Sequence, residues 1–321
     1  NIGLCYEGLL KWIKAHEIYS QIIKEYDVDN GQQAKDRLDF IEKYHLCELE
    51  KKNANGELDE DTYFTKIGIS LIESWEDLNK AKVLLEKAYK LNPENLETLF
   101  WLGVAYNYEA DQRLHYAEEK KEIQRIEVYK QKAWHIFKKI VRDSTNSKFA
   151  DKAQYKLGEY YADSTTVWDN DYKQAIREYK KIIEKYPDSE LCSNAQLKIG
   201  DCYRWLDDYH QAIKEYERVI EDYPATQETI IAQRSIGISY GALKDYEKAI
   251  DAYQKILNKF PKTQEAGLAL LDISEVYKEN LKDYNKAIEA YEEYIANYAK
   301  RKIDQEVYQE EINRLKVKAK K

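Results

Sequence analysis

A repeating pattern of small and aromatic residues is the feature of this sequence that most restricts its fold. Three segments align without gaps, each reading Ala-Gln-x-x-aliphatic-Gly-x-x-Tyr, and they begin at Ala153, Ala195 and Ala232. An Ala-Ile element follows each segment and recurs once more, so that the alanines lie 37, 37 and 38 residues apart, at Ala175, Ala212, Ala249 and Ala287. An aromatic residue stands four positions after each of these alanines, and a proline stands twelve positions after the first three, at Pro187, Pro224 and Pro261. A fixed period of this length predicts an array of stacked structural units rather than one globular core.

The same frame continues toward the N-terminus with changes of spacing. Gly103 leads to Ala133 and Phe137, Gly68 leads to Ala81, Leu85 and Pro93, and Gly3 leads to Ala15 and Tyr19. Small residues at the glycine and alanine positions allow two antiparallel helices to approach closely, and the residue four positions after the alanine lies on the same helical face. Proline cannot continue a helix, so it ends the second one. Each unit is therefore predicted to be a helix pair whose apolar face is covered by the next pair.

The composition agrees with long helices joined by short turns. Only 11 glycines and 4 prolines occur in 321 residues, whereas sheet proteins use many of both in their turns. Apolar residues make up 43% of the chain, which is enough to build a core. We therefore predict an all-α fold, a right-handed superhelical α-solenoid of about seven helix-turn-helix repeats.

These elements resemble the tetratricopeptide repeat family. The aliphatic-Gly-x-x-Tyr element, the Ala-x-x-x-aromatic element and the terminal proline recur in register and cover most of residues 1–299. The family's tryptophan four positions before the glycine is absent, and that position holds Phe64, Leu99, Gln154, Gln196, Gln233 and Leu270. The Ala-Gln opening and the Tyr-Pro-x-Ser/Thr ending look like a subclass common in bacterial envelope assembly proteins. The resemblance thus implies a bacterial protein of the cytoplasm, periplasm or envelope, although the sequence itself does not fix the compartment.

Departures from the regular spacing divide the chain into three predicted segments. Residues 1–60 hold irregular tetratricopeptide-like helices, one of them over 32–52, and a polar, acidic loop. Residues 61–299 form the array, and residues 300–321 form a capping helix near 301–319 with a basic tail. Gly103 and Ala133 lie 30 residues apart, 18 more than the usual 12, and no Gly or Pro interrupts residues 110–143. This stretch predicts a long helix and a helical-hairpin insertion at about 108–132 that extends the pair by about 13 Å.

Charge and motif content favour a protein without catalytic chemistry. The 51 basic and 59 acidic residues give a net charge of −8, which provides no general attraction to nucleic acid or an anionic membrane. No apolar run reaches the roughly 20 residues that span a bilayer. The sequence contains no phosphate-binding loop, dinucleotide fingerprint, zinc-protease helix or nucleophile elbow. The five histidines and four cysteines lack metal-ligand spacing, so we expect unpaired thiols and no catalytic residue, cofactor or metal.

The resemblance places function on the first helix of each pair. In the family, ligand contacts come from positions −3, +1, +4 and +5 relative to the glycine. The residues predicted to form a partner-binding groove are Phe100, Asn107, Tyr108, Tyr155, Leu197, Asp201, Arg204, Trp205, Arg234 and Leu271. Phe100 and Tyr155 could instead belong to the core between repeats. The predicted function is a non-enzymatic scaffold that binds an extended or helical segment of another protein in its concave groove and supports assembly of a larger complex.

Two other functions remain open on the sequence alone. The array could be the regulatory or docking region of a larger enzyme or receptor, because the chain opens inside a predicted first helix, two residues before Gly3. It could also self-assemble into a lattice through exposed repeat ends, since solenoids need caps to stay soluble. The sequence names no partner and leaves the oligomeric state open.

Overall fold

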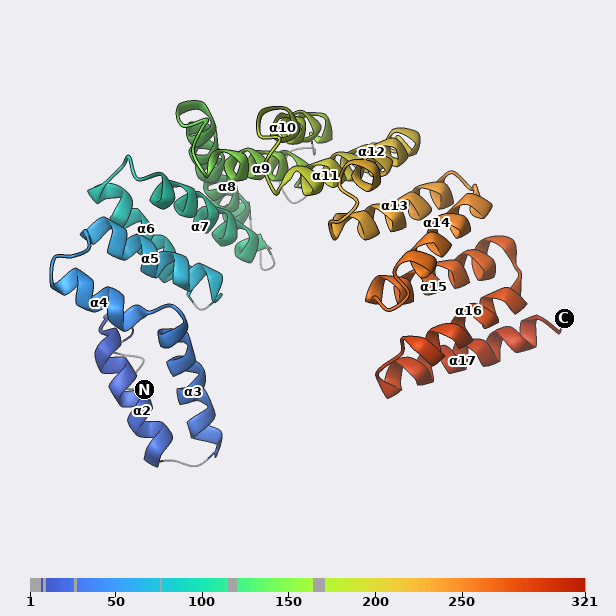
Figure 1. The fold of residues 1–321 in the computed structure, drawn as a ribbon, viewed down its shortest axis with the longest axis horizontal. Coiled ribbons are helices and arrows are strands. Elements are labelled where there is room, and N and C mark those ends of the chain that lie inside the picture. The colour runs from blue at the N-terminus through green and yellow to red at the C-terminus, as the bar shows by residue number, and fades with distance from the viewer. Residues whose placement is uncertain are drawn as a thin grey trace. The chain divides into compact units, whose positions relative to one another are not determined.

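A computed structural model describes residue 7 and residues 10–25, 28–75, 77–114, 120–163 and 171–320. These residues form helices joined by turns, and no strand occurs among them (Figure 1). The chain divides into two compact units: unit 1 comprises residues 1–160 and 165–169, and unit 2 comprises residues 161–164 and 170–321. The boundary between the units lies inside the predicted array. The predicted all-α repeat solenoid is confirmed, because consecutive helices pack as pairs and successive pairs pack on one another within each unit.

Unit 1 begins with the irregular part of the chain. Its helices are α2 (Trp12–Glu25), α3 (Val28–Lys43), α4 (Leu46–Ala54), α5 (Glu60–Glu73), α6 (Leu78–Leu91), α7 (Leu96–Leu114), α8 (Lys120–Asp143) and most of α9 (Ala150–Ala162). The single helix predicted over 32–52 is wrong, because His45 adopts a left-handed conformation with φ of 51° and separates α3 from α4. The predicted element at Gly3 lies outside the described residues. Asp61, which follows the predicted polar, acidic loop, is buried in α5, where it accepts hydrogen bonds from Asn92 and Asn95.

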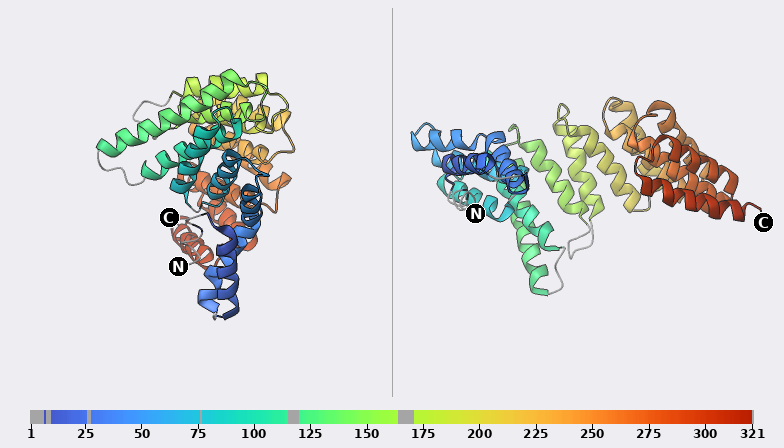
Figure 2. Two further views of the ribbon diagram at one scale, coloured as in Figure 1. Left: turned by 90° about the vertical axis from the view of Figure 1, so that its left-hand side faces the viewer. Right: turned by 90° about the horizontal axis from the view of Figure 1, so that it is seen from below.

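The long insertion folds as two helices rather than one. The stretch 110–143 is divided between α7, which has 19 residues, and α8, which has 24, whereas the neighbouring α6 has 14. Figure 2 shows α7 and α8 extending together as an arm of unit 1. Residues 115–119, between the two helices, lie outside the described residues. The extra residues therefore lengthen both members of one helix pair.

Unit 2 holds the most regular repeats. Its helices are α10 (Tyr172–Lys185), α11 (Cys192–Trp205), α12 (Tyr209–Asp222), α13 (Glu228–Ala242), α14 (Tyr246–Lys259), α15 (Gln264–Glu275), the π-helical turn η1 (Val276–Leu281), α16 (Tyr284–Asn297) and α17 (Lys302–Lys318). The second helices of unit 2 are α10, α12, α14 and α16; the first three end two residues before a proline, as α12 does at Asp222 before Pro224. They begin at an aspartate whose carboxylate accepts the backbone N–H three residues later, at Asp171, Asp208, Asp245 and Asp283. These caps satisfy a backbone donor that the helix itself leaves free.

A glycine and an aromatic ring meet where α11 crosses α12 and where α13 crosses α14. A Cβ atom placed on Gly200 would lie 2.5 Å from the ring of Tyr216, and one on Gly237 would lie 2.4 Å from the ring of Tyr253. Both tyrosines are buried. The first helix therefore contacts the aromatic ring of the second helix at a distance that only glycine permits. This close crossing fixes how the first helix presents its remaining side chains.

Candidate functional site

The first helices of unit 2 form a continuous surface. Helix α11 packs on α13, and α13 packs on α15. The side chains at positions −6, −3, +1, +4 and +5 from the small residue at each crossing (Gly200, Gly237 and Ser274) share one side of each helix, because they recur at intervals of three and four. We call this surface the first-helix face. It contains six of the predicted residues: Leu197, Asp201, Arg204, Trp205, Arg234 and Leu271.

Trp205 is the most exposed large apolar side chain of the first-helix face, and the half-buried Arg204 lies beside it. The Trp205 side chain, at the end of α11, is 60% exposed. The Arg204 guanidinium carbon lies 4.9 Å from the centre of the Trp205 ring. The Tyr172 ring lies parallel to the Trp205 ring at 6.5 Å. Among the described residues, no carboxylate forms an ion pair with Arg204, and its buried Nε atom has no hydrogen-bond partner. A cation and an indole ring are thus available side by side.

Asp201 and Leu197 have structural roles instead. The Asp201 carboxylate accepts a hydrogen bond of 2.8 Å from the Tyr216 hydroxyl and lies 3.5 Å from the Lys198 amine. It therefore holds the ring that packs beneath Gly200. Burial, together with this neighbouring carboxylate, raises the pKa of Tyr216 above its usual value. Leu197 is buried in the core between repeats, so the prediction that it contacts a partner is wrong.

Arg234 joins two repeats rather than facing solvent alone. Its Nε and Nη2 atoms donate to the two carboxylate oxygens of Asp272 on α15, at 2.6 and 3.1 Å. The hydrogen bonds to Asp272 raise the pKa of Arg234 above its usual value. Such a bidentate pair fixes α13 against α15 and leaves little of the guanidinium for a partner.

Two isoleucines on α13 flank Arg234 on the first-helix face. Ile231 is 42% exposed and Ile238 is 38% exposed, and they lie three residues before and four residues after Arg234. Residues at these spacings share a helical face. The four family positions do not include Ile231, which lies one helical turn before the −3 position held by Arg234. Extending the helical period by one turn would have predicted it. Together with Trp205, these side chains give the face three exposed large apolar side chains.

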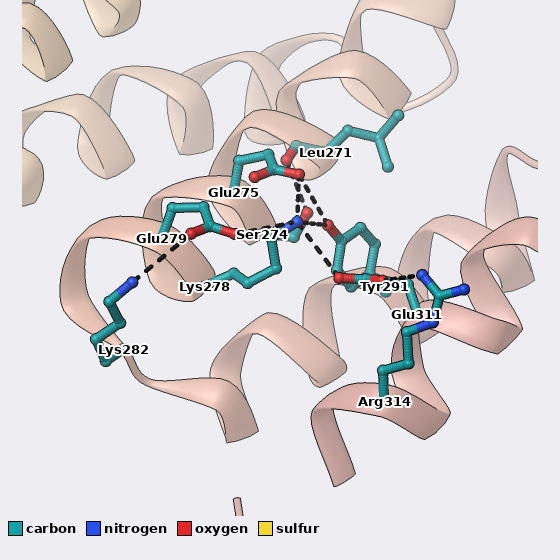
Figure 3. A network of polar contacts seen from close by, with 9 residues as sticks. All are labelled: Leu271, Ser274, Glu275, Lys278, Glu279, Lys282, Tyr291, Glu311 and Arg314. Atoms are coloured by element: carbon teal, nitrogen blue, oxygen red, sulfur yellow. Dashed lines mark hydrogen bonds and ion pairs between the residues drawn. The ribbon is translucent and has the colours of Figure 1, made fainter. Parts of the chain in front are cut away.

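The last repeat ends the face with a network of charges. Figure 3 shows Lys278 at its centre, with its amine 2.7 Å from Glu275, 3.6 Å from Glu279 and 3.5 Å from Glu311 of α17. The side chain is only 12% exposed. Burial acts to lower the pKa of Lys278, but the hydrogen bond to Glu275 and the surrounding oxygens raise it overall. The π-helical turn η1 carries Lys278, and this turn follows α15 directly.

Leu271 lies near this network but is half-buried. It packs against the apolar cluster that joins α16 and α17, which includes Tyr291 and Ile312. The Ser274 hydroxyl, which replaces the glycine of the other repeats, donates a hydrogen bond of 2.7 Å to the Leu271 carbonyl. Lys278 and Leu271 therefore help to hold the C-terminal helix rather than standing free.

The predicted residues of unit 1 divide in a similar way. Phe100 is buried and stacks on Phe149 with ring centres 5.3 Å apart, so it belongs to the core and not to a binding surface. Asn107, Tyr108 and Tyr155 are half-buried. The Tyr108 ring lies 4.8 Å from that of Trp75, which is 63% exposed. Trp75 lies just beyond the end of α5 and was not predicted.

The described residues show no constellation for metal chemistry. Within those ranges, no group of three His, Cys, Asp or Glu side chains could hold a metal ion. Cys47 and Cys202 are free thiols, and burial raises the pKa of Cys202 to about 12. Of the helices in the described ranges, none combines the length and the apolar character that crossing a membrane requires.

Comparison with known proteins identifies the family to which these repeats correspond. Sequence profiles of the tetratricopeptide repeat match residues 191–262 and residues 152–189 and 268–300. A search of curated proteins found no match. Solved structures with a similar fold include a tetratricopeptide repeat protein from Parabacteroides merdae ATCC 43184 (12% identity, 93% of this chain and 97% of that chain, TM-score 0.49). They also include the MamA protein (24% identity, 63% and 93%, TM-score 0.46).

A third similar structure is that of YrrB, described as a tetratricopeptide repeat protein with an unusual peptide-binding site (18% identity, 69% and 96%, TM-score 0.43). The profile matches cover the helices α9 to α16, where the glycine, alanine and proline frame is most regular. From its repeat frame, these profile matches and its paired helices, the chain belongs to the tetratricopeptide repeat family.

Proposed function

We propose that this chain is a non-enzymatic scaffold that binds a segment of another protein on the first-helix face of unit 2 and supports assembly of a larger complex. Stacked helical repeats offer extended surfaces that suit such binding. The observation that carries the proposal is the pairing of Arg204 with Trp205, because this cation lacks a carboxylate partner among the described residues and the ring is 60% exposed. Tryptophan and arginine are the residue types that most often dominate binding energy.

The exposed side chains define the chemistry of the partner segment. An acidic side chain in the partner would pair with Arg204, and apolar side chains would cover Trp205, Ile231 and Ile238. Arg234 is already paired with Asp272, and Lys278 with its glutamates, so the basic character of the face is concentrated at α11. The partner is therefore expected to place its acidic residue toward α11 and its apolar residues toward α13.

The double variant Arg204→Ala, Trp205→Ala tests the proposal. A matched control is Arg177→Ala, Trp75→Ala, which removes the same residue types from exposed positions outside the face. Tagged chains are used to recover partners from the native source, and each recovered protein is measured by quantitative mass spectrometry. We expect a partner that the wild type and the control recover equally and that the first variant loses at least tenfold. Helical content by circular dichroism should be the same in all three.

Equal recovery by both variants would contradict the assignment of the partner to this face. A purified partner then allows the affinity to be measured directly. Because truncation of a hot-spot side chain costs about 2 kcal/mol or more, the double variant should bind at least about 30-fold more weakly.

A further inference from the structure

The long helices α7 and α8 of unit 1 line an open pocket, and none of its lining residues belongs to the first-helix face. Its volume is about 620 Å³, and the residues that line it are Arg113, Gln124, Arg125, Val128, Tyr129 and Lys132. Three of the six side chains are cationic, and none is a carboxylate. The chain as a whole carries a net charge of −8, so the positive charge of this lining is opposite in sign to the net charge of the protein.

Three cationic side chains, two of which line the pocket, lie around the Tyr129 ring. The Lys82 amine lies 4.9 Å from the ring centre, the Arg113 guanidinium carbon 5.6 Å and the Lys132 amine 5.7 Å. The Tyr106 ring stacks on Tyr129 at 5.9 Å and is itself 5.0 Å from the Lys132 amine. Cations within about 6 Å of an aromatic ring are attracted by its negative face. The two tyrosines thus hold positive charge at the pocket without neutralising it.

Nearby carboxylates neutralise the other cations but not Lys132. The buried Glu109 pairs with Lys82 at 3.1 Å and with Arg113 at 2.6 Å. Glu122 pairs with Arg113 at 2.5 Å and with Arg125 at 3.2 Å.

A third carboxylate, Glu86, accepts the hydroxyl of Tyr106 at 2.7 Å. Within the described residues, the Lys132 amine lies against the two tyrosine rings, and no carboxylate forms an ion pair with it. The cluster of four cations and three carboxylates therefore keeps one excess positive charge, and Lys132 carries it.

We propose that this pocket binds an acidic side chain of a partner protein, with an apolar neighbour of that side chain resting on Val128 and Tyr129. The carboxylate would lie beside Lys132 and Arg125, because the Arg113 side chain is already engaged by two glutamates. Val128 is 50% exposed and supplies the apolar contact. The proposal does not rest on the first-helix face, since all of these residues belong to unit 1.

A labelled peptide tests the proposal on the full chain. The probe is a fluorescein-labelled 12-residue peptide of glutamate and leucine, and binding is measured by fluorescence anisotropy at low and high salt. We expect binding that weakens as salt rises, because salt screens charge pairs. Lys132→Glu should weaken binding at least tenfold. The matched control Lys138→Glu, on the same helix, also removes a cation from an aromatic ring, that of Trp134 at 4.3 Å, and should change affinity less than twofold.

Further variants keep the test independent of folding and of the other surface. Arg125→Glu alters a side chain that is 67% exposed and should also weaken binding, which provides a second result if Lys132→Glu loses helicity. The variant Arg204→Ala, Trp205→Ala should bind the peptide normally, so the two proposals can fail separately. Equal weakening by Lys138→Glu, or no binding by the wild type at low salt, would overturn the proposal. Binding of a phosphoserine peptide but not of the glutamate peptide would overturn the carboxylate assignment.

Discussion

Gly237→Ala offers a direct test of the close crossing between α13 and α14. The added Cβ would lie 2.4 Å from Cε1 of Tyr253, 2.7 Å from Cζ and 2.8 Å from Cδ1. The Tyr253 ring is 4% exposed, so it cannot swing into solvent to relieve the overlap. Overpacking a core in this way costs about 1–3 kcal/mol. Alanine returns about 0.5–1 kcal/mol through its better helix propensity. The net loss of unfolding free energy should therefore be about 1–2 kcal/mol.

The same helix provides the control. A Cβ on Gly241 would meet no heavy atom within 4 Å, so Gly241→Ala keeps the propensity gain without the overlap. Because Gly241 lies near the end of α13, that gain should be about 0.5 kcal/mol. Urea unfolding followed by circular dichroism should place the midpoint of Gly237→Ala below that of the wild type and the midpoint of Gly241→Ala at or above it. A Gly237→Ala chain as stable as the Gly241→Ala chain would refute the packing argument.

Three further predictions concern local features of unit 2. Asp245→Ala removes the cap of α14 and should lower the unfolding free energy by about 1 kcal/mol in urea, whereas Asp251→Ala, in an exposed ion pair, should change it by less than about 0.5 kcal/mol. Lys244 has φ of 61°, which is strained for a residue with a side chain, so Lys244→Gly should raise the unfolding free energy by about 0.5 kcal/mol and the melting temperature slightly. A melting temperature below that of the wild type would count against backbone strain at Lys244. Burial raises the pKa of Cys202 to about 12, because the folded chain favours the neutral thiol. The contribution of this buried thiol to folding stability is therefore full below the pKa of the unfolded thiol and is lost as the pH rises toward 12. Alkylation at pH 8 followed by mass spectrometry should therefore modify half-buried Cys47 before Cys202.

The repeat frame could be predicted from the sequence because each of its signals acts locally. Proline after a helix, glycine opposite an aromatic ring and alanine at a fixed interval all depend on residues within one helix pair. The spacing predicted a close approach of the two helices at Gly200, whereas the contact of Gly200 with the Tyr216 ring came from the structure. The N-terminal region lacked such signals, and the break at His45 was missed because a left-handed residue other than glycine leaves no clear mark in the sequence.

The candidate surface needed the tertiary structure. The family positions selected residues on the correct helices, but position alone could not separate buried Leu197 and Phe100 from exposed Trp205 and Ile231. Exposure depends on which side chains of the neighbouring repeat cover a position, and those contacts join residues far apart in the sequence.

Sequence alone thus determined that this chain is an array of helix pairs, because its small, aromatic and proline residues recur in one register. The tertiary structure decided which basic side chains pair with a carboxylate of the chain and which could still pair with a partner. Arg234 meets Asp272, 38 residues away, whereas Arg204 and Lys132 meet aromatic rings and no carboxylate among the described residues. Ion pairing depends on distances between separate helices, and these distances are fixed only when the helices pack.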